Sequence, residues 1–257
     1  MSSMLLERLR RAPPKPRYSV PDGLRVYAIG DVHGCVDELE DLLDAIDKDV
    51  GTSKLETHLV FLGDLVDRGP QSQDVIGLLR TGPLPADVAH FIMGNHEEVM
   101  IDCYEGSSDN CAAWLHYGGV ETLESYGLKR SDILSPSFDV KAAMRKAIPK
   151  AHIAFLKSFS DEVRLGDYLF VHAGIRPGIR IEDQWSRDLR WIRRGFLDDR
   201  SDHGCMVVHG HSIVAQVEFR QNRIAVDTGC YETGRLSAVA LEGDAARIVA
   251  IGPGTRT

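Results

Sequence analysis

GDVHG, at residues 30–34, comes directly after the mostly apolar run LRVYAI of residues 24–29. The same arrangement, an apolar run followed at once by glycine and polar residues, recurs along the chain. It recurs at GDLVDRG (63–69) after 58–62, at GNHE (94–97) after 88–93 and at HAG (172–174) after 168–171, and GH stands at 210–211. Runs of this length bounded by turn residues predict buried strands. The polar side chains are therefore expected at strand ends, on a stiff scaffold beside an open crevice.

The residue types in these stretches indicate a metal site. Aspartate, asparagine and histidine offer hard oxygen and borderline nitrogen ligands, which suit Mn²⁺, Fe or Zn²⁺ and not soft-metal thiolate sites. Two divalent ions about 3.5–4 Å apart can clamp a phosphoryl group and lower the pKa of a water molecule between them. Neighbouring glycines let the backbone turn sharply and approach a ligand closely. Together, the stretches predict a two-metal site that hydrolyses phosphate esters.

GDVHG, GDLVDRG and GNHE in this order resemble the metal-dependent phosphoprotein phosphatases of the calcineurin-like phosphoesterase superfamily. The resemblance covers about residues 24–252. It is closest to the prokaryotic and phage branch, which includes the bacteriophage lambda phosphatase and bacterial serine/threonine protein phosphatases. It implies a mixed α/β fold in which two β-sheets pack as a sandwich flanked by helices, the four-layer fold of these phosphatases, with a helical cap.

The resemblance also implies a ligand set for two divalent metal ions. Six residues match it: Asp31 and His33 for the first ion, Asp64 bridging both, and Asn95, His172 and His211 for the second. We expect Mn²⁺, with Fe, Zn²⁺, Ni²⁺ and Co²⁺ as alternatives, because such ligands accept all of these ions.

Four further residues match the family's catalytic groups. His96 matches the general acid, and Asp67 matches the carboxylate that orients its ring. Arg68 matches a guanidinium that grips the phosphate, and Arg193, in the segment LRWIR of residues 189–193, matches a second one. In the implied mechanism, a metal-bridging hydroxide attacks phosphorus in line and His96 protonates the leaving group.

Three hypotheses remain for the function. The first is a serine/threonine phosphoprotein phosphatase, with small phosphoesters as lesser substrates. The alternative is a dinucleoside polyphosphate hydrolase acting on diadenosine tetraphosphate. Those enzymes typically have alanine at the position of Asp67 and aspartate at that of Glu97, so the sequence favours the first hypothesis. A non-catalytic metal-bound scaffold is the third, and the presence of every motif residue argues against it.

Three residues near the motifs have open interpretations. Asp227 is either a support for the site or a turn-forming aspartate. His209 either lines the pocket or is an ordinary strand histidine, which is the safer interpretation. Glu97 is interpreted mainly as an early helix residue that the helix dipole favours.

Composition limits the partners and the location of the protein. The 257 residues carry a formal net charge of −8, which argues against nucleic acid as a partner. No run of 18 apolar residues is present, so no membrane span is expected. The five cysteines form no CxxC pair and fit reduced thiols in a cytoplasmic protein. The expected state is a monomer whose partner is a phosphoprotein or a small phosphoester.

The chain organisation follows from charge and periodicity. Residues 1–20 are basic and proline-rich and are predicted to form a mobile leader, and residues 21–257 are predicted to form one domain. Apolar residues at helical spacing predict helices after the first and second motifs, and the mostly helical residues 97–160 are predicted to form the cap. After residue 166, strands are expected at 169–171, 206–208, 224–226, 236–241 and 248–251.

Overall fold

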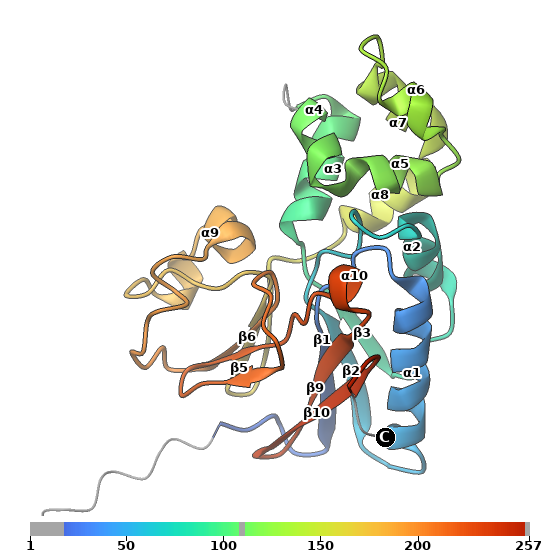
Figure 1. Cartoon of the computed structure of the whole chain (residues 1–257). Coiled ribbons are helices and arrows are strands. Elements are labelled where there is room, and N and C mark those ends of the chain that lie inside the picture. The colour runs from blue at the N-terminus through green and yellow to red at the C-terminus, as the bar shows by residue number, and fades with distance from the viewer. Residues whose placement is uncertain (1–17, 108–110, 255–257) are drawn as a thin grey trace, which may run out of the picture.

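A computed structural model describes residues 18–107 and 111–254 (Figure 1). Residues 1–17 of the predicted leader lie outside the described residues, and only its last three residues can be placed. The backbone N–H of Val20 donates to the Gly243 carbonyl at 3.0 Å, and that of Ser19 donates to the Asp167 carboxylate at 2.9 Å. Residues 18–20 are therefore bound to the folded part of the chain.

The first sheet has five strands in the order β10-β9-β1-β2-β3. Its strands are β1 (Leu24–Ile29), β2 (Glu56–Phe61), β3 (Val88–Phe91), β9 (Leu236–Glu242) and β10 (Ala245–Ile251). β1, β2 and β3 run parallel, whereas β9 runs antiparallel to both β1 and β10. Parallel neighbours place the carboxyl ends of β1, β2 and β3, and hence the first three motifs, along one edge of the sheet.

The second sheet has five strands in the order β4-β5-β6-β8-β7. Its strands are β4 (Glu162–Leu165), β5 (Tyr168–Val171), β6 (Met206–His209), β7 (Glu218–Phe219) and β8 (Arg223–Ala225). The three central strands are parallel, and the two outer strands are antiparallel to their neighbours. The stretches HAG and GH follow β5 and β6, so their side chains also lie at carboxyl ends of parallel strands.

The two sheets pack face to face, as the alternation of side chains between two cores along β1 shows. Val26 and Ala28 of β1 join Phe170 of β5 in a core between the sheets. Tyr27 and Ile29, which point to the other face of β1, join the core beneath the helices. This period of two is what a strand buried on both faces requires.

Helices cover the outer faces of both sheets. α1 (Val36–Val50) and α2 (Ser72–Thr81) bury apolar residues in the core beneath the first sheet, and α9 (Ser186–Trp191) buries Leu189 against the second. The predicted sandwich of two sheets flanked by helices is therefore confirmed.

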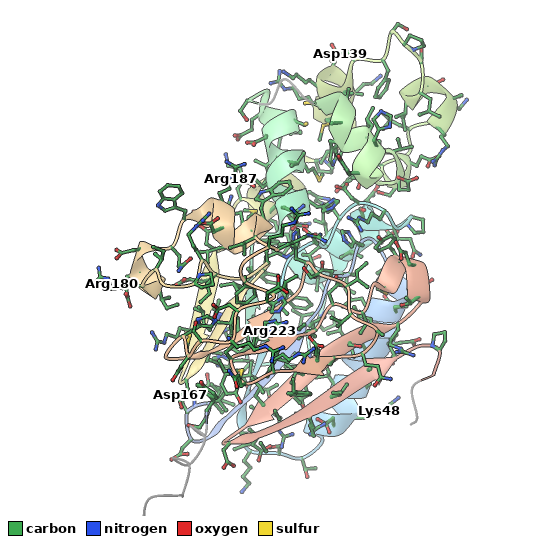
Figure 2. The ribbon with its side chains drawn as sticks, turned by 60° about the vertical axis from the view of Figure 1, so that its left-hand side comes forward. Lys48, Asp139, Asp167, Arg180, Arg187 and Arg223 are labelled. Carbon is green, nitrogen blue, oxygen red and sulfur yellow. The ribbon has the colours of Figure 1, made fainter. Side chains whose placement is uncertain are left out.

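A group of short helices occupies the predicted cap segment and lies above the sheets (Figure 1). The elements are α3 (Asn95–Glu105), α4 (Cys111–Trp114), the π-helix η2 (Leu115–Gly119), α5 (Val120–Ser125), α6 (Arg130–Ile133), α7 (Val140–Ala147) and α8 (Lys150–Leu156). A 3-10 turn, η3 (Ile181–Asp183), and the short helix α10 (Cys230–Thr233) follow later in the chain. Figure 2 places Asp139, which caps α7, at the far tip of this group and Lys48 of α1 at the other end of the molecule. None of the helices in the described parts of the chain is both long enough and apolar enough to cross a bilayer.

The sequence missed two strands, both at sheet edges. β4 has two charged residues among its four and no fully buried residue, and β7 has only two residues. Edge strands of this kind carry weak hydrophobic patterns because water reaches one side of them. All the strands that the sequence did predict are present, with ends shifted by up to three residues.

Candidate metal centre

The carboxyl ends of six strands from both sheets meet at one cavity of about 260 Å³. Eight of the ten predicted site residues line it: Asp31, His33, Asp64, Arg68, Asn95, His96, Arg193 and His211. The other two, Asp67 and His172, are fully buried directly behind the lining residues. The structure therefore brings together all ten residues, although they span more than 160 positions of the chain.

Asp64 lies at the middle of the group. Its Oδ2 atom is 3.3 Å from His172 Nε2, 3.7 Å from His33 Nε2 and 3.9 Å from His96 Nε2. Its Oδ1 atom accepts the backbone N–H of His96 at 3.0 Å. Although burial opposes ionisation, the positive fields of His172 and His96 hold the pKa of Asp64 well below its usual range. An ionised carboxylate between two sets of donors is the arrangement that a bridging ligand requires.

The donor atoms around His172 face one another. Its Nδ1 donates to the Leu62 carbonyl at 2.8 Å, which leaves Nε2 facing the site. Nε2 is 2.9 Å from Asn95 Oδ1 and 3.2 Å from His211 Nδ1. Nitrogen and oxygen atoms of the kinds that bind divalent ions thus converge beside the Asp64 carboxylate. Asp64, His172 and His211 accordingly form a group able to hold a metal ion.

A second donor group is built around His33. Its Nδ1 lies 2.8 Å from the Val66 carbonyl, which leaves Nε2 free to face Asp64. Burial lowers the pKa of His33 to about 3, so the ring is neutral and able to bind a metal. Nearby, both carboxylate oxygens of Asp31 lie 3.1 Å from the backbone N–H of His211, which links the two halves of the site.

The charge balance of the site favours cations. Asp31, Asp64, Glu97 and Asp227 are all buried around it. Burial, together with the charges of Asp227 and Asp64, raises the pKa of Asp31 well above its usual value. Burial also raises the pKa of Asp227 to about 6. Carboxylates buried together are costly without compensation, and divalent ions would supply it.

The backbone at the site is strained in a way seen nowhere else in the described residues. The non-glycine residues with a positive φ are His33 (46°), Asp64 (49°), Asp67 (71°), Arg68 (68°) and His211 (62°). All five are predicted site residues. Left-handed conformations cost side-chain-bearing residues roughly 1–2 kcal/mol each and cluster at functional sites, where the surrounding structure holds them.

His96 and Asp67 form a buried pair at the edge of the cavity. His96 Nδ1 lies 2.7 Å from Asp67 Oδ2. The same carboxylate accepts the Trp114 indole N–H at 2.8 Å and the Thr122 hydroxyl at 2.6 Å. Burial lowers the pKa of His96, but the charge of Asp64 and the hydrogen bond with Asp67 raise it by more, so the pKa lies above its ordinary value. The ring is thus oriented and favoured in its protonated form.

Two guanidinium groups lie beside these donors. Arg193 donates from Nε to His211 Nε2 at 2.9 Å and from Nη2 to the His211 carbonyl at 3.0 Å. Arg68 donates to the Tyr231 hydroxyl, with its guanidinium 4.7 Å from the centre of that ring. Both arginines therefore enter the cavity already oriented, which is the geometry needed to grip an oxyanion.

Comparison with known protein families identifies the family that has this kind of site. The model of the calcineurin-like phosphoesterases matches residues 24–236, a segment that contains every predicted site residue. The chain belongs to this family. Members of the family use two divalent metal ions, and the clusters of histidine and aspartate in this phosphoesterase fit that use. The protein is therefore a metal-dependent phosphoester hydrolase.

Similar proteins carry names that concern nucleotides. The phosphoesterase is 28% identical to a symmetrical bis(5'-nucleosyl)-tetraphosphatase of Methylococcus capsulatus, over 86% of this chain and 92% of the relative. It is 27% identical to the asymmetrical bis(5'-nucleosyl)-tetraphosphatase PrpE of Geobacillus thermodenitrificans, over 84% of this chain and 90% of the relative. These names favour the alternative function over the phosphoprotein phosphatase that the sequence motifs favoured.

Solved structures share the fold of the phosphoesterase. A candidate diadenosine tetraphosphatase matches with a TM-score of 0.60 and 23% identity, over 90% of this chain and 95% of that one. A serine/threonine phosphatase from Saccharomyces cerevisiae matches with a TM-score of 0.54 and 14% identity, over 91% and 82%. At these identities the likeness concerns the fold alone.

Glu97 has a larger part in the phosphoesterase site than its position suggested. Besides opening α3, its carboxylate accepts the backbone N–H groups of Asp64 at 2.8 Å, Leu65 at 2.7 Å and Gly94 at 3.0 Å. It therefore fixes the loop that carries Asp64. Only the tertiary fold reveals this role, since Asp64 and Leu65 are 33 and 32 positions away from Glu97.

The structure also bears on the other two open interpretations, those of Asp227 and His209. Asp227 has both features that the sequence suggested: it lines the cavity, and its Oδ1 accepts the Gly229 N–H at 2.8 Å in a turn. His209 ends β6 and does not line the cavity, as the safer interpretation held, but it is not a fully satisfied strand histidine, because its buried Nε2 has no hydrogen-bond partner among the described residues. The five cysteines are all buried, and none of them is in a disulfide.

Proposed function

We propose that the protein hydrolyses dinucleoside polyphosphates at a phosphoanhydride bond, with two divalent ions, Mn²⁺ first among them. The observation that supports this most is the pair of relatives named bis(5'-nucleosyl)-tetraphosphatases, each matched over nine-tenths of its length. The negative net charge of the chain argues against nucleic acid as a partner but not against a small phosphoester compound. A diadenosine polyphosphate is such a compound.

The ligand roles follow the donor groups. Asp31 and His33 would hold one ion, Asn95, His172 and His211 the other, and Asp64 both. When bound, two such ions supply Lewis acidity that polarises the phosphoryl oxygens and lowers the pKa of water. Side chains of the protein would supply the other catalytic groups.

The arginines and His96 would act on the substrate itself. Arg68 and Arg193 reach the cavity from two different loops and would bind the phosphoryl oxygens as negative charge develops on them. His96, held by Asp67, would donate its Nε2 proton to the departing oxygen.

A second candidate is the phosphoprotein phosphatase, and the pair of His96 and Asp67 favours it. A serine or threonine alkoxide is a strong base and needs a proton to leave, whereas a nucleotide leaves from an anhydride with much less help. An oriented general acid is therefore worth most on a phosphate monoester.

Product analysis with diadenosine tetraphosphate tests the proposal. We expect Mn²⁺-dependent cleavage that stops on chelation, giving two ADP if the split is symmetrical and ATP with AMP if it is asymmetrical. The relatives bear both names, so the products also assign the split. No nucleotide product, while a phosphoseryl peptide releases phosphate, would reverse the order of the two candidates. No turnover of either substrate by metal-loaded protein would favour the scaffold.

A further inference from the structure

A groove of about 400 Å³ adjoins the metal centre and is built from two kinds of residue. At its inner end it shares Arg68, Asn95, His96, Arg193 and His211 with the centre. Its outer part is apolar and aromatic, formed by Val99, Ala113, Trp114, Tyr117 and Trp191. A ligand that extends from the metal centre into the groove would thus meet metal ligands and guanidinium groups at one end and aromatic rings at the other.

Two of these aromatic side chains are exposed to solvent although they line the groove. Tyr117 is 66% exposed and Trp191 is 42% exposed. They come from different parts of the fold, Tyr117 from η2 in the helical group and Trp191 from the end of α9. Exposed aromatic rings that border a concave site are suited to contact a flat ligand.

Trp191 is held in position before any ligand binds. Its indole Nε1 donates to Glu98 at 2.5 Å, and the other oxygen of Glu98 accepts from Arg190 at 2.7 Å. Arg190 also donates to Asp161 at 2.7 Å. Because the ring is fixed at its polar edge, its face remains available and little conformational entropy is lost on binding.

Tyr117 is fixed through the backbone of its turn. The neighbouring Gly118 has a φ of 113°, and its carbonyl accepts the backbone N–H of Arg68 at 3.3 Å. A side chain at Gly118 would place its Cβ only 2.3 Å from that nitrogen, so the close approach requires glycine. The kinked turn that presents Tyr117 is thereby tied to the loop that presents Arg68.

We propose that this groove binds the nucleobase of the substrate, with Trp191 and Tyr117 as stacking residues. The inference rests on the proposed function for its occupant. A nucleotide has the same arrangement of groups as the groove, with phosphate for the metal ligands and arginines at one end and a flat base for the aromatic rings at the other. Stacking accepts every base, because each has a π face, so the site selects a nucleotide and not one particular base.

Calorimetric binding of AMP and of ribose 5-phosphate to the Mn²⁺-loaded protein tests the proposal without requiring turnover. The two ligands carry the same phosphate and sugar and differ in the base. We expect AMP to bind roughly tenfold more tightly, as one stacked base provides. Trp191→Ala should bring the ratio of the two dissociation constants close to one, and Trp191→Phe should keep most of it.

Trp185→Ala is the matched control, because Trp185 is 73% exposed beside α9 but does not line the groove. It should keep the wild-type ratio. Equal binding of the two ligands, or an unchanged ratio in Trp191→Ala, would overturn the proposal. A base-dependent ratio in a protein that leaves diadenosine tetraphosphate intact would instead contradict the proposed function and leave the groove assigned.

Discussion

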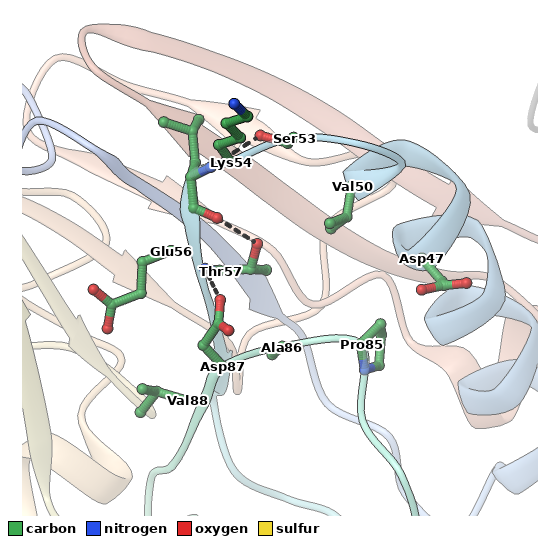
Figure 3. A pocket seen from close by; sticks show the side chains of 11 residues that line it. Asp47, Val50, Ser53, Lys54, Glu56, Thr57, Pro85, Ala86, Asp87 and Val88 are labelled. Carbon is green, nitrogen blue, oxygen red and sulfur yellow. Dashed lines mark hydrogen bonds between the residues drawn. The ribbon is translucent and has the colours of Figure 1, made fainter.

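The parallel strands β1, β2 and β3 have polar residues at both of their ends, and the two ends differ in how those residues are satisfied. At the amino ends, a hollow of about 770 Å³ opens between the end of α1 and the starts of β2 and β3 (Figure 3). There the Asp87 carboxylate accepts the Thr57 N–H at 2.8 Å. At the carboxyl ends, the smaller cavity of about 260 Å³ gathers carboxylates, histidines and arginines, and Asn95 Oδ1 lies 2.9 Å from His172 Nε2 beside it.

The difference shows that the size of a hollow does not identify a site. In the larger hollow the Leu55 N–H, the Thr57 N–H and the Thr57 hydroxyl all meet acceptors within the chain. In the smaller one, the buried carboxylates of Asp31, Asp64 and Asp227 converge, and every non-glycine residue of the described chain with a positive φ lies in its lining or directly behind it. Such costs persist where function maintains them.

The largest expected effect is that of Asp64→Asn. We expect turnover to fall by a thousandfold or more and both ions to bind weakly, because the residue would contact both. Steady-state turnover and metal content after dialysis measure this. Asp87→Asn at the opposite strand ends is the control and should change neither. Two tightly held ions in the Asp64 variant would refute the bridging role.

His96→Asn should retain the metal ions and lower the rate. The loss should be about 10²- to 10⁴-fold on an alkyl phosphate, the usual contribution of a general acid. It should be much smaller on diadenosine tetraphosphate or p-nitrophenyl phosphate, whose leaving groups need less protonation. Rates on all three substrates decide the matter, and equal losses would exclude acid catalysis by His96.

Asp67→Asn should change the pH dependence of kcat. Asp67 helps to raise the pKa of His96, and the protonated ring is the active form. Removing the charge lowers that pKa, so the proton is lost at a lower pH and the alkaline limb of the profile moves to lower pH. A profile measured with the alkyl phosphate reports this most directly. An unmoved limb would mean that His96 is not the group that titrates.

Arg68→Ala should weaken inhibition by inorganic phosphate roughly tenfold, because hydrogen bonds to a charged group are lost. Arg187→Ala is the control, since Arg187 is exposed on α9 (Figure 2) and does not line the cavity. Inhibition constants for phosphate in both variants give the comparison. An unchanged constant in the Arg68 variant would remove that residue from the phosphate site.

The smallest effect is expected at the amino ends of the strands. Asp87→Ala leaves the buried Thr57 N–H without its partner and should reduce the free energy of unfolding by about 1 kcal/mol. Urea denaturation measures that loss, and kcat on any substrate should remain within twofold. A large fall in kcat would show that the two ends are coupled.

Much of the fold could be predicted because motif and periodicity coincide. Each motif of the first sheet follows an apolar run, and the heptad-like spacing of Leu39, Leu42 and Ile46 predicts α1. β4 and β7 could not be found, since short edge strands bury too little surface to leave a pattern.

The site residues also differ in how well the sequence predicted them. Residues within the motifs could be matched one by one, whereas their supports depend on contacts between distant segments. Trp114 and Thr122 reach Asp67 across 47 and 55 positions, and no local pattern marks them. Substrate choice was the least predictable feature, because it depends on the surface beside the metal centre and not on the motifs.

The ratio of kcat/KM for diadenosine tetraphosphate to that for a phosphoseryl peptide, both measured with Mn²⁺, tests the central claim most directly. We predict a ratio well above one, with nucleotide products that account for all the substrate consumed. A ratio well below one would contradict the claim and show that the pair of His96 and Asp67 serves a phosphoprotein phosphatase.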